Sequence, residues 1–188
     1  MRDSESVGVF RPRGAMVSAM FGAIWLLAWW HQAHRASLVI LFVIIVSVAM
    51  VMAAAFVQLR RFRRIELAAS PGYRASRFRL YGIVNAIYWP FVGITVVVLG
   101  ASGHARWINP AIILLVGLHL FPLGRIFRDG LFHLTGVLLV VLAVAYPVVA
   151  DPASPVGLFG AGTILLVTGA AAIVAGNSSR PGPLRDPV

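Results

Sequence analysis

The sequence predicts an all-α integral membrane protein, a bundle of six transmembrane helices arranged as three antiparallel hairpins with both termini in the cytoplasm. The first observation behind this fold class is composition: the 188 residues are 60% hydrophobic and 12% charged, whereas soluble domains contain about 25% charged residues. The second is distribution, because the charges fall in short clusters between long apolar stretches. A mean hydropathy of +0.88 suits a chain surrounded by lipid. The length fits one bundle and leaves no room for a separate soluble domain.

Six stretches are candidates for membrane spans, because each is long, apolar and free of Asp, Glu and Arg. A helix crosses the hydrocarbon core of roughly 30 Å with about 20 residues. The predicted spans cover residues 14–30, 37–59, 80–101, 107–124, 131–149 and 156–176. Together they form one transmembrane domain, 14–176. It lies between a cytoplasmic N-terminal segment, 1–13, and a cytoplasmic tail, 177–188, and both end segments are expected to be disordered.

The first span follows Arg11 and Arg13, as the apolar region of a signal peptide would. It nevertheless ends in Trp29 and Trp30 without a small-residue cleavage site, so it is interpreted as a span with tryptophans at the interface. The second helix is expected to continue through Arg64, until Ser70-Pro71-Gly72 breaks it. The first, third and fifth loops, His31–Ala36, Ser102–Arg106 and Ala150–Pro155, are short, which favours tight hairpins.

The arginines determine the predicted orientation. Fourteen of the sixteen basic residues, all of them arginine, lie in the N-terminal segment, the second and fourth loops and the tail. Only Arg35 and Arg106 lie on the other side. Basic residues near span ends are retained in the cytoplasm, so both termini are predicted to be cytoplasmic and the location to be the inner membrane. This explanation accounts for the net charge of +10 without nucleic acid, since the arginines follow the loops.

The second loop holds a cluster of seven arginines that has two interpretations. One is contact with anionic lipid headgroups of the inner leaflet, to which each basic residue contributes roughly 1 kcal/mol. The plainer one is that the charges only determine topology. The cluster consists of Arg60, Arg61, Arg63, Arg64, Arg74, Arg77 and Arg79.

The last span carries a stripe of mostly small residues at steps of four. Small residues allow helices in lipid to approach closely, so this stripe predicts helix packing. The partner is either another helix of the bundle or a second copy in a homo-oligomer, and the bundle is the simpler explanation. The stripe consists of Gly160, Ile164, Thr168, Ala172 and Gly176.

Histidines raise the question of a metal or cofactor. His31, His34 and His104 lie on the non-cytoplasmic side, where three imidazoles are a possible zinc or copper site. Two-histidine spacing is a weak pattern, and we interpret them as polar residues at a wet interface. Haem held by His119 and His133 is disfavoured because their depths differ. The sequence contains no cysteine, and we predict no metal and no cofactor.

The stretch Gly117–Leu134 places ionisable residues among apolar ones. His119 lies roughly 8 Å inside the predicted cytoplasmic boundary, Asn85 roughly 7–8 Å and His133 roughly 5 Å, at 1.5 Å per helical residue. Three successive helices therefore place polar groups in one layer, accompanied by Tyr88. The alternative interpretation is structural: a buried histidine that only donates to a carbonyl of a neighbouring helix.

The rim and the shape of this layer suggest what it binds. Arg125, Arg128 and Asp129 form the rim. Pro90 and Pro122 are expected to bend their helices at this depth. The result is a predicted ligand cavity open to the cytoplasm. The spans contain no carboxylate, which disfavours proton pumps and cation channels. A small anionic or neutral ligand suits the site better.

Three functions compete at this stage. The leading one is binding or transport of that small ligand around His119. The second is a structural or regulatory membrane subunit that acts through the stripe of the last helix. The third is a membrane-embedded enzyme acting on lipid, which is disfavoured because no catalytic motif accompanies the few ionisable residues.

Overall fold

The computed structural model describes residues 3–33, 37–68, 71–127 and 129–178, and side chains within 14–33, 37–60, 79–127 and 129–175. Across these ranges the chain is all-helical, without strands, as the sequence predicts. The helices are α1 (Asp3–Gln32), α2 (Leu38–Ala68), α3 (Pro71–Ala101), α4 (Ile108–Phe127), α5 (Gly130–Val149) and α6 (Val156–Ser178). A short 3-10 helix, η1 (Ala105–Trp107), precedes α4.

The prediction of six long apolar helices is confirmed. All six long helices contain a segment that is long and apolar enough to cross a membrane, and each segment ends within a few residues of the predicted one. The segments are Gly14–Gln32, Leu38–Arg60, Arg79–Ala101, Ala105–Phe127, Gly130–Val149 and Val156–Ala175. Six such helices are compatible with a multi-pass membrane protein.

α1, α2 and α3 extend well beyond their spans. α2 continues past Arg64, as expected, to Ala68, and α3 begins at Pro71, so Pro71 and Gly72 start the next helix. Ser70, the first residue of the expected break, lies outside the described residues. Proline suits the first helical position because the N–H that it lacks would be unpaired there anyway. The expectation that residues 1–13 are disordered is wrong from Asp3 onward, since α1 begins there. A helix already nucleated by the span adds one hydrogen bond per further residue, so extension is easy.

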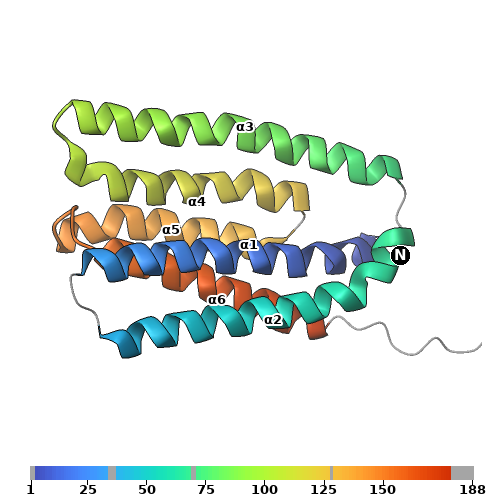
Figure 1. The fold of residues 1–188 in the computed structure, drawn as a ribbon. Helices are drawn as coiled ribbons and strands as arrows, with labels where there is room; N and C mark the ends of the chain where they lie inside the picture. Colours follow the sequence, from blue (N-terminus) through green and yellow to red (C-terminus); the bar gives the residue numbers. More distant parts are fainter. Residues whose placement is uncertain (1–2, 34–36, 69–70, 128, 179–188) are drawn as a thin grey trace, which may run out of the picture.

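The six helices lie side by side with similar axes, and successive helices run in opposite directions (Figure 1). The most extensive contacts join α1 to α6 and α4 to α5, whereas α1 and α2 pack less closely and α5 and α6 less still. α3 packs mainly against α4 and forms one edge of the bundle, with α2 at the opposite edge (Figure 1). Helices distant in sequence are thus among the closest neighbours.

Small residues produce the two closest seams. At the seam between α4 and α5, a Cβ added to Gly136 would lie 2.8 Å from the carbonyl oxygen of Gly117, so only glycine permits this approach. At the seam between α1 and α6, a Cβ added to Gly162 would lie 3.0 Å from the carbonyl oxygen of Gly22 and 2.6 Å from the side chain of Leu26. Packing of this kind, rather than exclusion of water, drives helix association in lipid.

The described members of the predicted α6 stripe contact other helices of the bundle. Gly160 faces Leu142 of α5, and the hydroxyl of Thr168 lies 2.8 Å from that of Thr135. Ala172 is buried against α1 and α2. The burial and contacts of Gly176, the last member of the stripe, lie outside what the structure describes.

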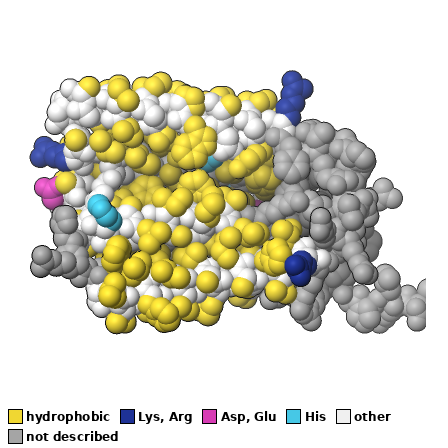
Figure 2. Space-filling view, viewed as in Figure 1, with side chains coloured by type: hydrophobic (Ala, Val, Ile, Leu, Met, Phe, Trp, Pro, Cys, Tyr) yellow, Lys and Arg dark blue, Asp and Glu magenta, His cyan; other side chains and the backbone are white. Residues whose placement is uncertain are grey.

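Apolar side chains cover the outside of the molecule as well as the inside. On the face shown in Figure 2 they extend across the middle, whereas the described arginines appear at the two ends. Many large apolar residues of α2 and α3 are exposed, including Phe42, Ile87 and Val97. An apolar band with charged ends fits a lipid environment, because soluble proteins rarely expose contiguous apolar surfaces of this extent.

Candidate functional site

A cavity of about 240 Å³ lies between α1, α3 and α4, at the level of His119. α5 and α6 contribute one residue each to its wall. The lining residues are Gly14, Val17, Ser18 and Phe21 of α1; Tyr81, Asn85, Tyr88 and Trp89 of α3; Val116, His119, Leu120, Leu123 and Phe127 of α4; Phe132 of α5; and Leu165 of α6.

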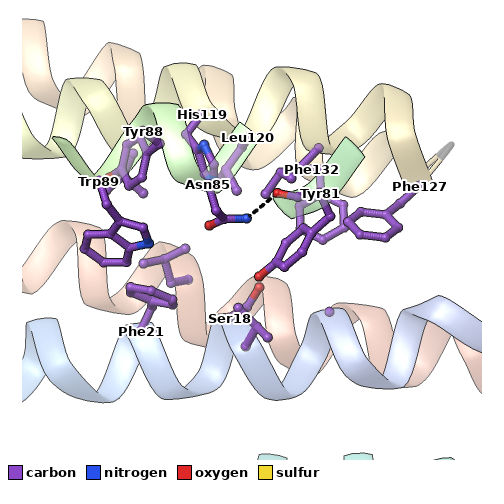
Figure 3. Close-up of a pocket in the computed structure, with 15 residues that line it drawn as sticks. Ser18, Phe21, Tyr81, Asn85, Tyr88, Trp89, His119, Leu120, Phe127 and Phe132 are labelled. Carbon is purple, nitrogen blue, oxygen red and sulfur yellow. Dashed lines mark hydrogen bonds between the residues drawn. The ribbon is translucent and has the colours of Figure 1, made fainter. Parts of the chain in front are cut away.

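The cavity exists because α3 does not pack closely on α1. Large side chains separate the two helices: Phe21 and Trp89 stack across the gap with ring centroids 6.3 Å apart and planes inclined by 25°. The glycines that would allow close approach face away, since an added Cβ at Gly82, Gly93 or Gly100 would meet nothing within 4 Å. The space beside this stacked pair, between α1, α3 and α4, is the cavity (Figure 3).

His119 is the most distinctive residue of the site. Its imidazole is half-buried and stacks on the ring of Tyr88, with centroids 4.1 Å apart and planes inclined by 27°. Among the described residues, neither ring nitrogen of His119 nor the hydroxyl of Tyr88 has a hydrogen-bond partner. Lipid offers no hydrogen-bond partner to such groups, so a partner for them has to come from inside the cavity.

Further polar atoms reach the cavity from α1 and α3. The amide nitrogen of Asn85 donates to the carbonyl oxygen of Tyr81, 2.9 Å away, so the amide oxygen of Asn85 remains as an acceptor at the cavity. Ser18 is buried on α1, and the hydroxyls of Ser18 and Tyr81 point toward one another across the gap (Figure 3). Polar groups from three helices therefore surround one space.

Aromatic rings line the end of the cavity nearest the loop between α4 and α5. Tyr81 lies against Phe127 with centroids 6.0 Å apart, and Phe127 lies 5.9 Å from Phe132. The sequence predicted a cavity that opens to the cytoplasm. In the structure a hollow appears on the side of the bundle, between α3 and α1, with a histidine side chain visible inside it (Figure 2).

The structure brings together only part of the predicted site. Asn85, Tyr88 and His119 line the cavity, and His133, Arg125 and Asp129 do not. His133 lies between α5 and α4, where its ring occupies the space beside Gly124 that a Cβ would need. Its Nδ1 lies 3.4 Å from the backbone oxygen of Asp129.

The two described rim residues have other surroundings, and Arg128 lies outside the described residues. Arg125 is exposed near the end of α4. Asp129 is buried and caps α5, because its carboxylate accepts a hydrogen bond of 3.0 Å from the backbone N–H of Leu131. Aspartate is among the preferred residues at this position, since its side chain satisfies one of the unpaired donors at a helix start. The position of Asp129 is thus explained by helix capping.

The arginine cluster is described only at its two ends. Arg60 is exposed, and its guanidinium carbon lies 4.5 Å above the ring of Phe56. Arg79 is exposed as well. The other members lie outside the described side chains: Arg61, Arg63, Arg64, Arg74 and Arg77.

The histidines considered as metal ligands are only partly described. His31 and His104 are exposed, and Nδ1 of His104 lies 2.9 Å from the backbone oxygen of Ser102. His34 lies outside the described residues. Within the described part of the chain, no three His, Cys, Asp or Glu residues form a group that could hold a metal ion.

Sequence reasoning missed the contribution of α1. Ser18 lies roughly 6 Å inside the predicted boundary at 1.5 Å per residue, close to the depth of Asn85 and His119. Ser18 is the only residue with a hydroxyl in the first predicted span, and this could have indicated that α1 contributes to the polar layer. The aromatic residues of the wall gave no such signal, because Phe21, Trp89 and Phe132 resemble any other apolar positions of a span.

Comparisons of the chain with protein-family models, with curated proteins and with solved structures find no match. The chemistry of the cavity rests on the residues that line it. They supply hydroxyl, amide and imidazole groups, within walls that are mostly aromatic and aliphatic. None of these fifteen lining residues is Arg, Lys, Asp or Glu. Such a site can hold an uncharged molecule by shape and by a few hydrogen bonds.

Proposed function

We propose that this chain is a multi-pass membrane protein that binds a small neutral ligand in the cavity around His119. The observation that carries the proposal is the set of polar atoms without partners at this cavity, above all the ring nitrogens of His119 and the hydroxyl of Tyr88. A neutral imidazole offers one donor and one acceptor, and a phenol offers both as well. A ligand that pairs with them would remove the cost of leaving them unpaired in lipid.

A neutral ligand is favoured over the anionic alternative. An anion taken out of water needs a cation or many donors to offset the cost of desolvation. Arg125, the described arginine of the expected rim, is exposed and does not line the cavity. The cavity walls offer uncharged donors only, which match a carbonyl or a hydroxyl better than a carboxylate or a phosphate.

The proposed setting is an inner membrane with both termini in the cytoplasm. Support comes from the positions of described arginines: Arg60, Arg79 and Arg125 lie at helix ends on the side assigned to the cytoplasm, and Arg106 lies in an opposite loop. This asymmetry follows the retention of basic residues on the cytoplasmic side. Exposed Arg60 and Arg79 also support the proposal that the arginine cluster contacts anionic lipids of that leaflet.

The alternative, a structural or regulatory subunit that acts through α6, receives less support. Its described stripe is occupied within the bundle, where Thr168 pairs with Thr135 and Gly160 faces Leu142. A homo-oligomer would therefore need another surface. The exposed edge helices, α2 and α3, offer one.

The substitution His119→Leu tests the proposed function through the thermal melt of the purified protein in mild detergent. Leucine is apolar, similar in bulk and at home in a membrane helix. If the histidine is retained for ligand binding, the melting temperature stays the same or rises, because functional residues are often kept at a cost to stability. The exposed His31 provides the matched control, His31→Leu. A clear drop in the melting temperature for His119→Leu alone would make the histidine structural and contradict the proposal.

A further inference from the structure

The cavity has its opening on the lipid-facing side of the bundle. Val17 of α1 and Trp89 of α3 both line the cavity and are exposed on the outside, to 43% and 51%. Val17 and Trp89 lie on the two helices that border the gap, and Trp89 stacks on Phe21 of α1 there. A hollow is visible between α3 and α1 on this face (Figure 2). A ligand using this opening would come from the bilayer.

The walls of the cavity are flat. Tyr88 and His119 stack with nearly parallel planes and form one wall, and the rings of Phe21, Phe127 and Phe132 lie around the remaining space (Figure 3). Aromatic faces prefer to contact other flat rings in offset or edge-to-face arrangements. The space between them therefore suits a planar head rather than a branched or spherical one.

Hydrogen-bond donors approach this space from different helices. Neutral His119 on α4 has one N–H, and the hydroxyls of Tyr88 on α3 and Ser18 on α1 can each donate. Within the described part of the chain, none of these three groups has a hydrogen bond to another residue. His119 and Tyr88 lie in one wall and Ser18 lies on α1 at the other side of the space (Figure 3). Donors on two sides of a flat space fit a ring that carries acceptors on opposite edges, and a carbonyl oxygen is the neutral acceptor of this kind.

The size of the cavity limits how much of the ligand it can enclose. Sites that bury a whole drug-sized molecule measure about 300–1,000 Å³, and this cavity measures about 240 Å³. It can take a single substituted ring but not a long chain in addition. The rest of a larger ligand would have to remain in the lipid outside the opening.

We infer that the ligand is a neutral amphiphile of the prenylated quinone class, whose flat dicarbonyl ring enters between α1 and α3 while its apolar tail stays in the bilayer. This inference rests on the proposed function and gives it a ligand class and a direction of approach. In the complex, the donors of His119, Tyr88 and Ser18 meet the ring carbonyls. Phe21 and Trp89 lie beside the point where the tail leaves.

The experiment uses a benzoquinone with a ten-carbon tail as the probe and tryptophan fluorescence of the full chain in lipid nanodiscs as the readout. Quinones quench nearby indole rings, and Trp89 lines the cavity. We expect saturable quenching that is lost in Trp89→Phe, a variant that keeps an aromatic ring opposite Phe21. The matched ligand control is the same tail on a benzene ring without oxygen atoms, which is expected not to compete.

Three further variants separate the parts of the inference. Tyr88→Phe removes only a hydroxyl and His119→Leu removes the imidazole donor, and each is expected to weaken binding about tenfold, the effect of losing one hydrogen bond in a dry site. Val17→Phe narrows the opening without touching a donor or adding an indole, and is expected to slow binding of the probe. His31→Leu, far from the cavity, is expected to bind as the unchanged protein does.

The outcomes distinguish this inference from the proposed function. Equal binding of the oxygen-free ring, or no saturable quenching at all, would overturn the quinone assignment. In either case, ligand binding at the cavity would remain supported if the melting temperature of His119→Leu equals or exceeds that of the unchanged protein. Saturable quenching whose rate Val17→Phe does not affect would overturn approach between α1 and α3.

Discussion

The substitution Gly136→Ala tests whether close backbone approach holds α4 and α5 together. A Cβ at this position would lie 2.8 Å from the carbonyl oxygen of Gly117 and 3.4 Å from Cβ of Leu120. The first of these contacts is with backbone, so relief requires the helices to separate. Overpacking of this kind costs about 1–3 kcal/mol. Alanine also favours a helix over glycine by about 1 kcal/mol, which offsets part of the cost.

The matched control for this prediction is Gly93→Ala in α3, where an added Cβ would meet nothing within 4 Å. Both positions lie inside helices, so the gain in helix propensity cancels in the comparison. The free energy of unfolding, measured by denaturing-detergent titration in mixed micelles, should then be lower for Gly136→Ala than for Gly93→Ala by about 1–3 kcal/mol. Equal stabilities of the two variants would refute close packing as the source of the α4–α5 seam.

Two further predictions concern the ends of α5 and use the same unfolding measurement. Asp129→Ala should lower the free energy of unfolding by about 1 kcal/mol because it removes the N-cap. Asp129→Asn should retain most of the stability, because asparagine can also cap a helix. An equal loss of stability in the two variants would contradict the capping role. Tyr146→Phe should cost about 1 kcal/mol, because the hydroxyl of Tyr146 donates to the backbone oxygen of Pro152 at 3.0 Å. An unchanged stability of Tyr146→Phe would mean that water replaces this bond.

Hydropathy alone was sufficient to find the six helices and their approximate ends. In lipid every backbone group must be paired within its own segment, so a long apolar run has no alternative to a helix. The same one-dimensional information gives depth, because each residue adds 1.5 Å along the axis. That is why Asn85 and His119, both assigned to one layer from their distance to a span end, do line one cavity in the structure.

Depth does not determine direction, and this limited the prediction of the site. His133 was assigned to the same layer, but α5 is rotated so that its ring fills the space beside Gly124. Asp129 was assigned to the rim because it is charged, although its place directly before Gly130, the first residue of α5, is also that of an N-cap. The capping signal was available in the sequence, whereas the rotation of α5 depends on contacts between helices.

The pattern of close helix packing explains why a cavity forms between α1, α3 and α4. Gly162 brings α6 against Gly22 of α1, and the pair Gly117 and Gly136 joins α4 to α5. These two close seams leave α3 with α4 as its main partner, and α3 presents Tyr81, Asn85, Tyr88 and Trp89 on the side that lines the cavity. Residues of that size cannot form a seam of the same kind with α1. The side chains that keep α3 away from α1 are thus the same ones that supply the aromatic walls and polar groups of the proposed ligand site.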